Sequence, residues 1–282
     1  MYEIAEEINS LSEYIDFIYN YGKKVKTELW YRGQRDNRWI LDATLNREKK
    51  MDIPSLGIGE VARLKYTNIL NFMLELDELK KRLNGSIPAI YNKFHLMFLG
   101  QHYRLKTPAL DWSTDSLVAL FFALNDFKYE KDIFPVIYIL KPAKLNENSM
   151  IIYKDGESIC EPLNIDGLSD SVFDKWFSDI NDTPFSVVPL AVKSSYDISY
   201  RITRQSGVFT LMDSRQSLGH PWIQTKIKGE PFGITIKINP MRVNDILEHL
   251  EALNITKQTI YGSDHKEWDD ICEEIVKDTP KL

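Results

Sequence analysis

The chain has 282 residues, of which 43% are hydrophobic and 27% charged, and its formal net charge is −6. These values are typical of a globular protein with one large or two small domains, and its apolar runs are too short to cross a membrane. Cys160 and Cys272 form neither a disulfide framework nor a metal-binding spacing. Acidic residues near Met1 exclude a secretory signal, so we expect a cytoplasmic protein with no membrane partner.

The first hundred residues predict helices around short strands. Residues 3–20 have the apolar spacing of an amphipathic helix, and a strand is expected at 29–31, directly before an Arg-Gly pair. A second short strand is expected at 39–41. Long helices are expected at 54–84, where Asn-Gly ends the run, and at 88–102.

The remaining residues mix strands and helices without regular β-α-β alternation. A strand at 109–112 leads into an apolar helix at 116–125, which Thr114 or Asp115 is expected to cap. Further strands rich in β-branched residues are expected at 136–140, 151–153, 187–190 and 233–238. Helices at 241–253 and 265–277 are expected to close the chain. The pattern favours an α+β fold.

Charge is unevenly distributed along the chain. Residues 22–50 are rich in lysine and arginine, whereas residues 147–182 are rich in acids. The basic region could attract a phosphate-bearing ligand, and the acidic segment at 141–186 could form a lid or a partner surface. Two solvated faces of opposite sign explain the same pattern.

Four short strings place polar residues in apolar surroundings: Trp30 to Gln34, Gln101-His102-Tyr103, Leu110 to Ser113, and Arg201 to Phe209. Buried polar groups need hydrogen-bond partners, so we expect the strings to meet in one pocket.

Each string also has a structural reading. The fork of Arg32 suits a diphosphate or ribose, but it could instead pair with Asp111. Gly33 could admit a flat ligand or form a bulge. Asp111 or Ser113 could face a ligand or cap a helix, with Trp112 in the core.

Letter matches to other known sites fail in context. Residues 57–62 fit a dinucleotide fingerprint but follow Pro54-Ser55 rather than a strand. The sequence has no Walker loop, no His-Glu-x-x-His, no Gly-x-Ser-x-Gly and no cluster of Cys and His. We therefore expect neither serine hydrolysis nor a bound metal.

Together the strings resemble the FRG domain family, named for an aromatic-Arg-Gly motif, here Tyr31-Arg32-Gly33. The family's middle segment matches Gln101 to Ala123, and its later Arg-Ile-x-x-Gln-x-Gly-x-Phe string matches Arg201 to Phe209. The resemblance covers about residues 28–275. Its first motif strand is similar to that of ADP-ribosyltransferases, which bind NAD in a split sheet.

The resemblance implies an α+β fold with a split antiparallel or mixed β-sheet of ADP-ribosyltransferase-like type, surrounded by helices. Residues 1–27 would form an N-terminal helical extension, and residues 28–282 a single domain. That domain would carry a helical insertion at about 54–100 and an acidic insertion at about 141–186.

The resemblance also implies roles for site residues. Arg32, Ser113 and Gln205 would be catalytic. NAD, the co-substrate, would be held by Tyr31, Arg32, Gly33, Gln34, His102, Tyr103, Asp111 and Trp112. An acceptor would meet Arg35, Arg38 and Arg204. Gln205 stands where ADP-ribosyltransferases usually have a Glu on a late strand, so the resemblance places Gln205 on such a strand, and an amide cannot supply negative charge. Glu157 or Glu161 could take that role instead, and modification of protein arginine is in doubt.

The leading hypothesis is an NAD-dependent ADP-ribosyltransferase toxin that modifies a nucleic acid, with RNA favoured, or a protein. If water enters, it would hydrolyse NAD. The resemblance implies a bacterial toxin–antitoxin or anti-phage system, with a cognate antitoxin that could dock on residues 147–182. The alternative is a non-catalytic nucleotide- or nucleic-acid-binding module. A purely structural protein explains the four strings least well.

Overall fold

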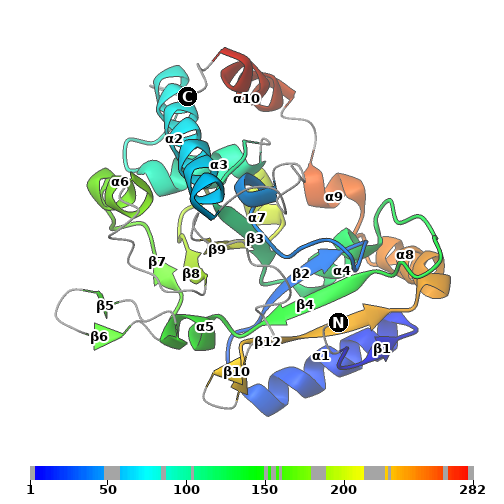
Figure 1. The fold of residues 1–282 in the computed structure, drawn as a ribbon. Helices are drawn as coiled ribbons and strands as arrows, with labels where there is room; N and C mark the ends of the chain where they lie inside the picture. Colours follow the sequence, from blue (N-terminus) through cyan, green and yellow to red (C-terminus); the bar gives the residue numbers. More distant parts are fainter. Residues whose placement is uncertain are drawn as a thin grey trace.

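The computed structural model describes residues 4–47, 58–83, 87–102, 105–148, 152–153, 157–158, 161–178, 189–212, 226–227, 230–262 and 266–278. Figure 1 shows a central sheet with helices gathered around both of its ends. The helices are α1 (Leu11–Val25), α2 (Ile58–Arg82), α3 (Lys93–His102), α4 (Ser116–Leu124), α5 (Pro142–Asn148), α6 (Asp170–Ser178), α7 (Tyr200–Arg204), α8 (Val243–Ala252), α9 (Lys257–Tyr261) and α10 (Lys266–Asp278).

The sheet has eight strands and mixed pairing. Its spatial order is β1 (Glu7–Ile8), β12 (Gly233–Ile238), β4 (Val136–Leu140), β2 (Trp30–Gln34), β3 (Ala109–Ser113), β9 (Gly207–Leu211), β8 (Leu190–Lys193) and β7 (Leu163–Asn164). The outermost pairs at both edges are parallel, and the inner pairs are antiparallel. Two hairpins, β5–β6 (Ile152–Tyr153 and Glu157–Ser158) and β10–β11 (Lys226–Ile227 and Glu230–Pro231), lie apart from it. The predicted α+β class is confirmed.

The two halves of the sheet have separate helical cores. Apolar residues of α1, α4 and α8 cover β2, β4 and β12, and those of α2, α3, α6 and α10 cover β3, β8 and β9. The residues of β4 explain its central place in the sheet. All five of its residues are buried, with Ile137 and Ile139 facing one core and Val136, Tyr138 and Leu140 facing another.

The N-terminal segment belongs to the sheet. Residues 7–8 pair with β12, and the predicted helix at 3–20 begins only at Leu11. Ser10 explains the late start: its backbone is extended, and its hydroxyl accepts the Glu13 N–H at 3.2 Å. The helix continues beyond the predicted end, to Val25, and buries Tyr14 against the core that α4 and α8 share.

The predicted strand at 39–41 is wrong. The Trp39 N–H donates to the Asp36 carbonyl at 3.1 Å, and the Asp36 carboxylate accepts the Arg38 N–H at 2.8 Å. These bonds close a turn, so the segment is a loop rather than a strand paired in the sheet.

No helix among the described residues is long and apolar enough to span a membrane.

The acidic segment contains more structure than its composition indicates. It forms α5 and α6, and the described acids of α6 pair within the chain. Lys80 Nζ lies 2.6 Å from Asp170 and Lys93 Nζ lies 2.7 Å from Asp174. Just before α6, Asp166 accepts hydrogen bonds from Ser194 and from His95, whose Nδ1 accepts the Asn92 N–H. These acids tie α6 to α2 and α3, so fewer of them are left for a partner.

Candidate functional site

The sheet is nearly divided between β2 and β3. These strands share a single residue pair, Tyr31 with Ser113, whereas each pairs along its length with its other neighbour. Arg32 bridges the gap: its Nη1 donates to the Asp111 carbonyl at 2.6 Å and lies 2.9 Å from Asp111 Oδ1. The guanidinium thus supplies a hydrogen bond between the two strands, and the structural alternative for Arg32, a pair with Asp111, is confirmed.

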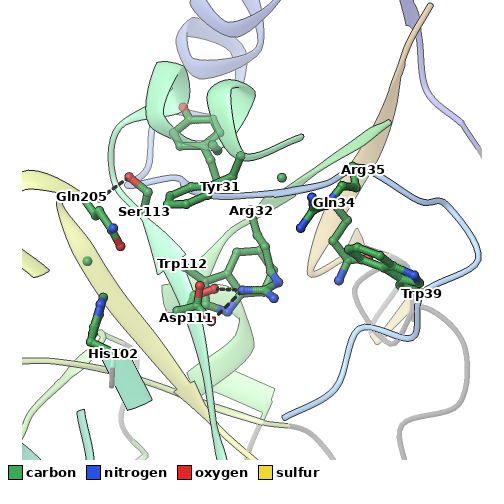
Figure 2. Close-up of a pocket in the computed structure, with 14 residues that line it drawn as sticks. Tyr31, Arg32, Gln34, Arg35, Trp39, His102, Asp111, Trp112, Ser113 and Gln205 are labelled. Carbon is green, nitrogen blue, oxygen red and sulfur yellow. Dashed lines mark hydrogen bonds and ion pairs between the residues drawn. The ribbon is translucent and has the colours of Figure 1, made fainter. Parts of the chain in front are cut away.

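A cavity of about 160 Å³ opens at this divergence. Figure 2 shows polar and aromatic side chains from both sides of the split pointing toward one space. The predicted site residues in its wall are Tyr31, Arg32, Gly33, Gln34, Arg35, His102, Asp111, Trp112, Ser113 and Gln205. The sequence therefore predicted which distant strings meet.

Two predicted site residues, Arg38 and Arg204, lie elsewhere. Tyr103 is outside the described residues. Arg38 pairs with Asp36 at 2.8 Å, and Arg204 donates to the carbonyls of Gln258 and Thr259; neither lines the cavity. The structure thus gives the predicted acceptor-binding residues Arg38 and Arg204 intramolecular partners. Of the two proposed substitutes for the late acid, Glu157 lies in the separate β5–β6 hairpin, and Glu161 is exposed and does not line the cavity.

Asp111 is the one carboxylate among the described residues of the cavity wall. Its Oδ1 accepts the Gln101 Nε2 at 3.2 Å, and Gln101 is itself held by the Thr107 hydroxyl. Burial raises the pKa of Asp111, but Arg32 and then His102 outweigh it and lower the pKa to about 2. The side chain is 49% exposed, so an ionised carboxylate faces the cavity.

Gln101 belongs to one of the motif strings, but the sequence predicts no role for it. Its place in the Gln-His-Tyr string, at the end of α3 and ten positions before Asp111, was the available signal. Trp39 and Phe122 also line the cavity and were missed. Nothing in their local sequence distinguishes them from ordinary core residues.

His102 is neutral at physiological pH. Burial lowers its pKa to about 4, opposed by Asp111 and assisted by Arg201. The ring meets Phe209 edge to face, with centroids 6.1 Å apart, and the main-chain carbonyl accepts from Arg201 Nη1 at 3.0 Å. Arg201 also lies over the Tyr261 ring, so its position is fixed within the chain.

The depressed pKa of His102 predicts an acid-sensitive stability. The unfolded imidazole takes up a proton near pH 6.5, whereas the folded one does so only near pH 4. The contribution is therefore complete above pH 6.5 and is lost as pH falls toward 4. Between pH 7 and pH 5, urea unfolding should show the wild type losing on the order of 1–2 kcal/mol more than His102→Gln.

The same comparison separates His102 from His95. Burial also lowers the pKa of His95, but this residue is present in both proteins and its effect cancels. Equal losses of stability in wild type and His102→Gln would contradict the prediction.

Three buried side-chain atoms of the described residues have no hydrogen-bond partner: Arg32 Nε, Gln34 Oε1 and His102 Nε2. All three residues line this cavity. An unsatisfied buried polar atom costs roughly 1–3 kcal/mol, and such atoms are rare in folded proteins. The arginine nitrogen is a donor and the glutamine oxygen an acceptor, and both atoms lie behind the cavity surface, so a ligand that offers both kinds of group would satisfy them once these two side chains turn toward the cavity.

Ser113 and Gln205 are already joined to each other. The Ser113 hydroxyl donates to the Gln205 carbonyl at 2.7 Å and accepts the Asp115 N–H at 2.9 Å. A ribose hydroxyl could still donate to Ser113, but Ser113 has no second proton to give. Asp115 caps α4, which confirms one of the two predicted caps.

The predicted placement of Gln205 on a late strand is wrong. Gln205 follows α7, which Ser199 caps at its start, and β9 begins only at Gly207. Between them Ser206 has a left-handed backbone, with φ 48°. The Gln205 side chain therefore enters the cavity from a helix end, and its Nε2 lies 3.4 Å from the Ile260 carbonyl.

Gly33 has a structural explanation. A Cβ atom there would lie 1.9 Å from the Ala119 carbonyl oxygen in α4, so the missing side chain lets α4 rest directly on β2. A role for Gly33 beside a nicotinamide ring stays a prediction. Trp112 is 3% exposed and donates its indole N–H to Thr210, as its core reading predicted. Burial, followed by the charge of Asp115, raises the pKa of Tyr31 to about 12, so this phenol stays neutral.

These features define an α+β fold with a small polar cavity where two strands of a mixed sheet diverge. Comparison with known families identifies part of the chain. Residues 27–132 match the FRG domain, so the predicted resemblance to this family is confirmed over that part of the chain. The match includes β2, β3 and α4, but Gln205 lies beyond it. No curated protein and no solved structure matches the chain.

Proposed function

We propose that the protein is an NAD-dependent ADP-ribosyltransferase that holds the nicotinamide end of NAD in the cavity. The observation that supports this is the set of unpartnered polar atoms. A carboxamide offers one acceptor oxygen and two donor hydrogens, so nicotinamide can accept from Arg32 Nε and donate to Gln34 Oε1. Tyr31 and Phe122 supply aromatic surface to the same wall.

The cavity size favours one end of a dinucleotide. Its volume of about 160 Å³ is below the roughly 300–1,000 Å³ of pockets that enclose drug-sized ligands. A pyridine ring and part of its ribose would fill it. The diphosphate of the bound NAD would then extend out of the cavity opening, where Arg35 supplies a partly exposed positive charge.

The reaction breaks the bond between the nicotinamide nitrogen and the ribose carbon, and the electron pair leaves with nicotinamide. Positive charge develops on the ribose, and the oxygen or nitrogen of an acceptor O–H or N–H then bonds to that carbon while its proton passes to water. The Asp111 carboxylate would stabilise the cation, which the Gln205 amide cannot do. Gln205 and Ser113 would hold ribose hydroxyls, and Arg32 with Gln101 would position Asp111.

The acceptor and biological setting follow from the FRG resemblance. We propose a nucleic acid acceptor, with RNA favoured over protein, and a bacterial toxin–antitoxin or anti-phage role in the cytoplasm. An antitoxin could bind residues 147–182, although several acids there already pair with α2 and α3.

The direct test is to incubate the purified protein with adenylate-labelled NAD and, separately, RNA, DNA and cell protein. We expect free nicotinamide, with label transferred to one acceptor class, and at least about a 100-fold loss in Arg32→Ala. Arg242→Ala is the matched control, because it removes an exposed arginine that pairs with Asp245 at the surface, away from the cavity wall. Label on water-soluble ADP-ribose alone would indicate NAD hydrolysis.

A non-catalytic nucleotide-binding module is the second candidate. It is favoured by Gln205 standing in place of an acid and by Arg32 neutralising the only carboxylate among the described wall residues. Such a module would bind NAD or a nucleotide and return it intact. Binding with no nicotinamide release would establish it and overturn the transferase.

A further inference from the structure

Trp39 lies at the opening of the cavity, and its side chain is unusually exposed for a tryptophan. We propose that Trp39 and Arg35 form a stacking surface for a nucleobase, an inference that rests on the proposed nucleotide specificity of the cavity. Both residues belong to the cavity wall, and Figure 2 shows them together at one side of it.

Trp39 keeps a large apolar surface in water. Its relative exposure is 46%, whereas Trp30, Trp112 and Trp176 are 0%, 3% and 5% exposed. Tryptophan is highly buried on average because its transfer from water is strongly favourable. An exposed indole beside a polar cavity is therefore a candidate ligand contact.

The loop around Trp39 is fixed in place. Asp36, 8% exposed, accepts the Arg38 N–H at 2.8 Å, and its carbonyl accepts the Trp39 N–H at 3.1 Å. Asn37 exchanges two hydrogen bonds with the backbone of Phe134, each 3.1 Å long. The indole is held at the surface by its backbone, which prearranges it for a partner.

The charges nearby indicate a nucleotide rather than an uncharged aromatic ligand. The Arg35 guanidinium carbon lies 5.4 Å from the centre of the Trp39 ring, in cation–π geometry. Arg35 and Lys257 share Asp126, each at 3.9 Å, and all three side chains are well exposed. Such surface pairs are weak, so either cation can turn to a phosphate. A flat base on the indole with its phosphate on Arg35 uses both groups.

The base has two sources within the proposed reaction: the adenine of NAD and a base of the nucleic acid acceptor. The test measures binding of NAD, nicotinamide mononucleotide and a short single-stranded RNA to the full chain by calorimetry. Trp39→Ala should weaken binding of at least one base-bearing probe by about 5-fold to 150-fold. Trp39→Phe should recover most of it, and nicotinamide mononucleotide, which has no adenine, should be unaffected.

Tyr129→Ala is the matched control, since Tyr129 is 66% exposed but lines a different groove. Weakened NAD binding alone identifies adenine, and weakened RNA binding alone identifies an acceptor base. Unchanged binding of both in Trp39→Ala overturns the stacking surface even if nicotinamide is released. If binding depends on Trp39 but no nicotinamide is released, the transferase proposal is overturned and the stacking surface stands. If the wild type binds no probe, both the transferase and the stacking surface are overturned.

Discussion

Asp111→Asn is expected to reduce nicotinamide release from NAD by about 100-fold to 1,000-fold. The substitution keeps the shape of the side chain and removes the only negative charge among the described residues of the cavity wall. A neutral amide cannot offset the positive charge that develops on the ribose. Affinity for intact NAD should fall by much less than the rate of nicotinamide release, because in the ground state the positive charge is on the nicotinamide ring and it moves to the ribose only as the bond breaks. Steady-state nicotinamide release and calorimetric NAD binding give the two readouts.

A second variant separates chemistry from folding. Asp111→Asn leaves Arg32, whose side chain is only 13% exposed, without its anionic partner and should lower the melting temperature. Combining it with Arg32→Gln removes the unpaired charge, so stability should return, which shows how much of the effect of Asp111→Asn comes from folding. Asp245→Asn, which breaks an exposed Arg–Asp pair, is the control for both assays. Activity within threefold of wild type in Asp111→Asn would show that the carboxylate is dispensable.

Gly33→Ala should destabilise the fold by more than about 3 kcal/mol. The new Cβ would lie 1.9 Å from the Ala119 oxygen and 2.6 Å from the Ala123 nitrogen, both backbone atoms of α4 that cannot rotate away. Helix α4 would have to move off β2, disturbing the core that it shares with α1 and α8. We expect a melting temperature lower by at least about 6 °C, or loss of folded protein, measured by circular dichroism.

Gly167→Ala provides the comparison for Gly33→Ala. A Cβ atom at Gly167 would meet nothing within 4 Å, so the change should stay within about 0.5 kcal/mol of wild type. If Gly33→Ala melts like Gly167→Ala, the close approach of α4 is not what requires glycine in the motif. A ligand contact would then be its remaining explanation.

Helices and strands with a clear pattern in their own residues were predicted correctly. The apolar run of α4 and its cap Asp115 were found, as were β4 and β12, whose β-branched residues fill two cores. The strands β1 and β9 were missed. β1 has two residues and exists because β12 pairs with it, and β9 begins in a turn after α7. Such strands are specified by their partners rather than by their own residues.

The motif strings predicted which residues would meet, but not how. Arg32 and Asp111 lie 79 positions apart, and the family pattern brought them together. The reason for Gly33 lies in the backbone of α4, and the placement of Gln205 depends on the cap at Ser199. Contacts of this kind depend on how separate elements stack, which a single sequence does not encode locally.

The strand order has a consequence for synthesis on the ribosome. β4 sits between β2 and β12, and β12 is made nearly a hundred residues after β4. Until residue 238 emerges, one edge of Val-Ile-Tyr-Ile-Leu has no native partner, and such an apolar edge is prone to pair with other chains. Gln205 is also synthesised after the other residues of the cavity wall described above, so a nascent chain that lacks it cannot form the complete cavity. Loss of the last fifth of the chain, including β12, should therefore yield aggregates rather than a smaller folded protein.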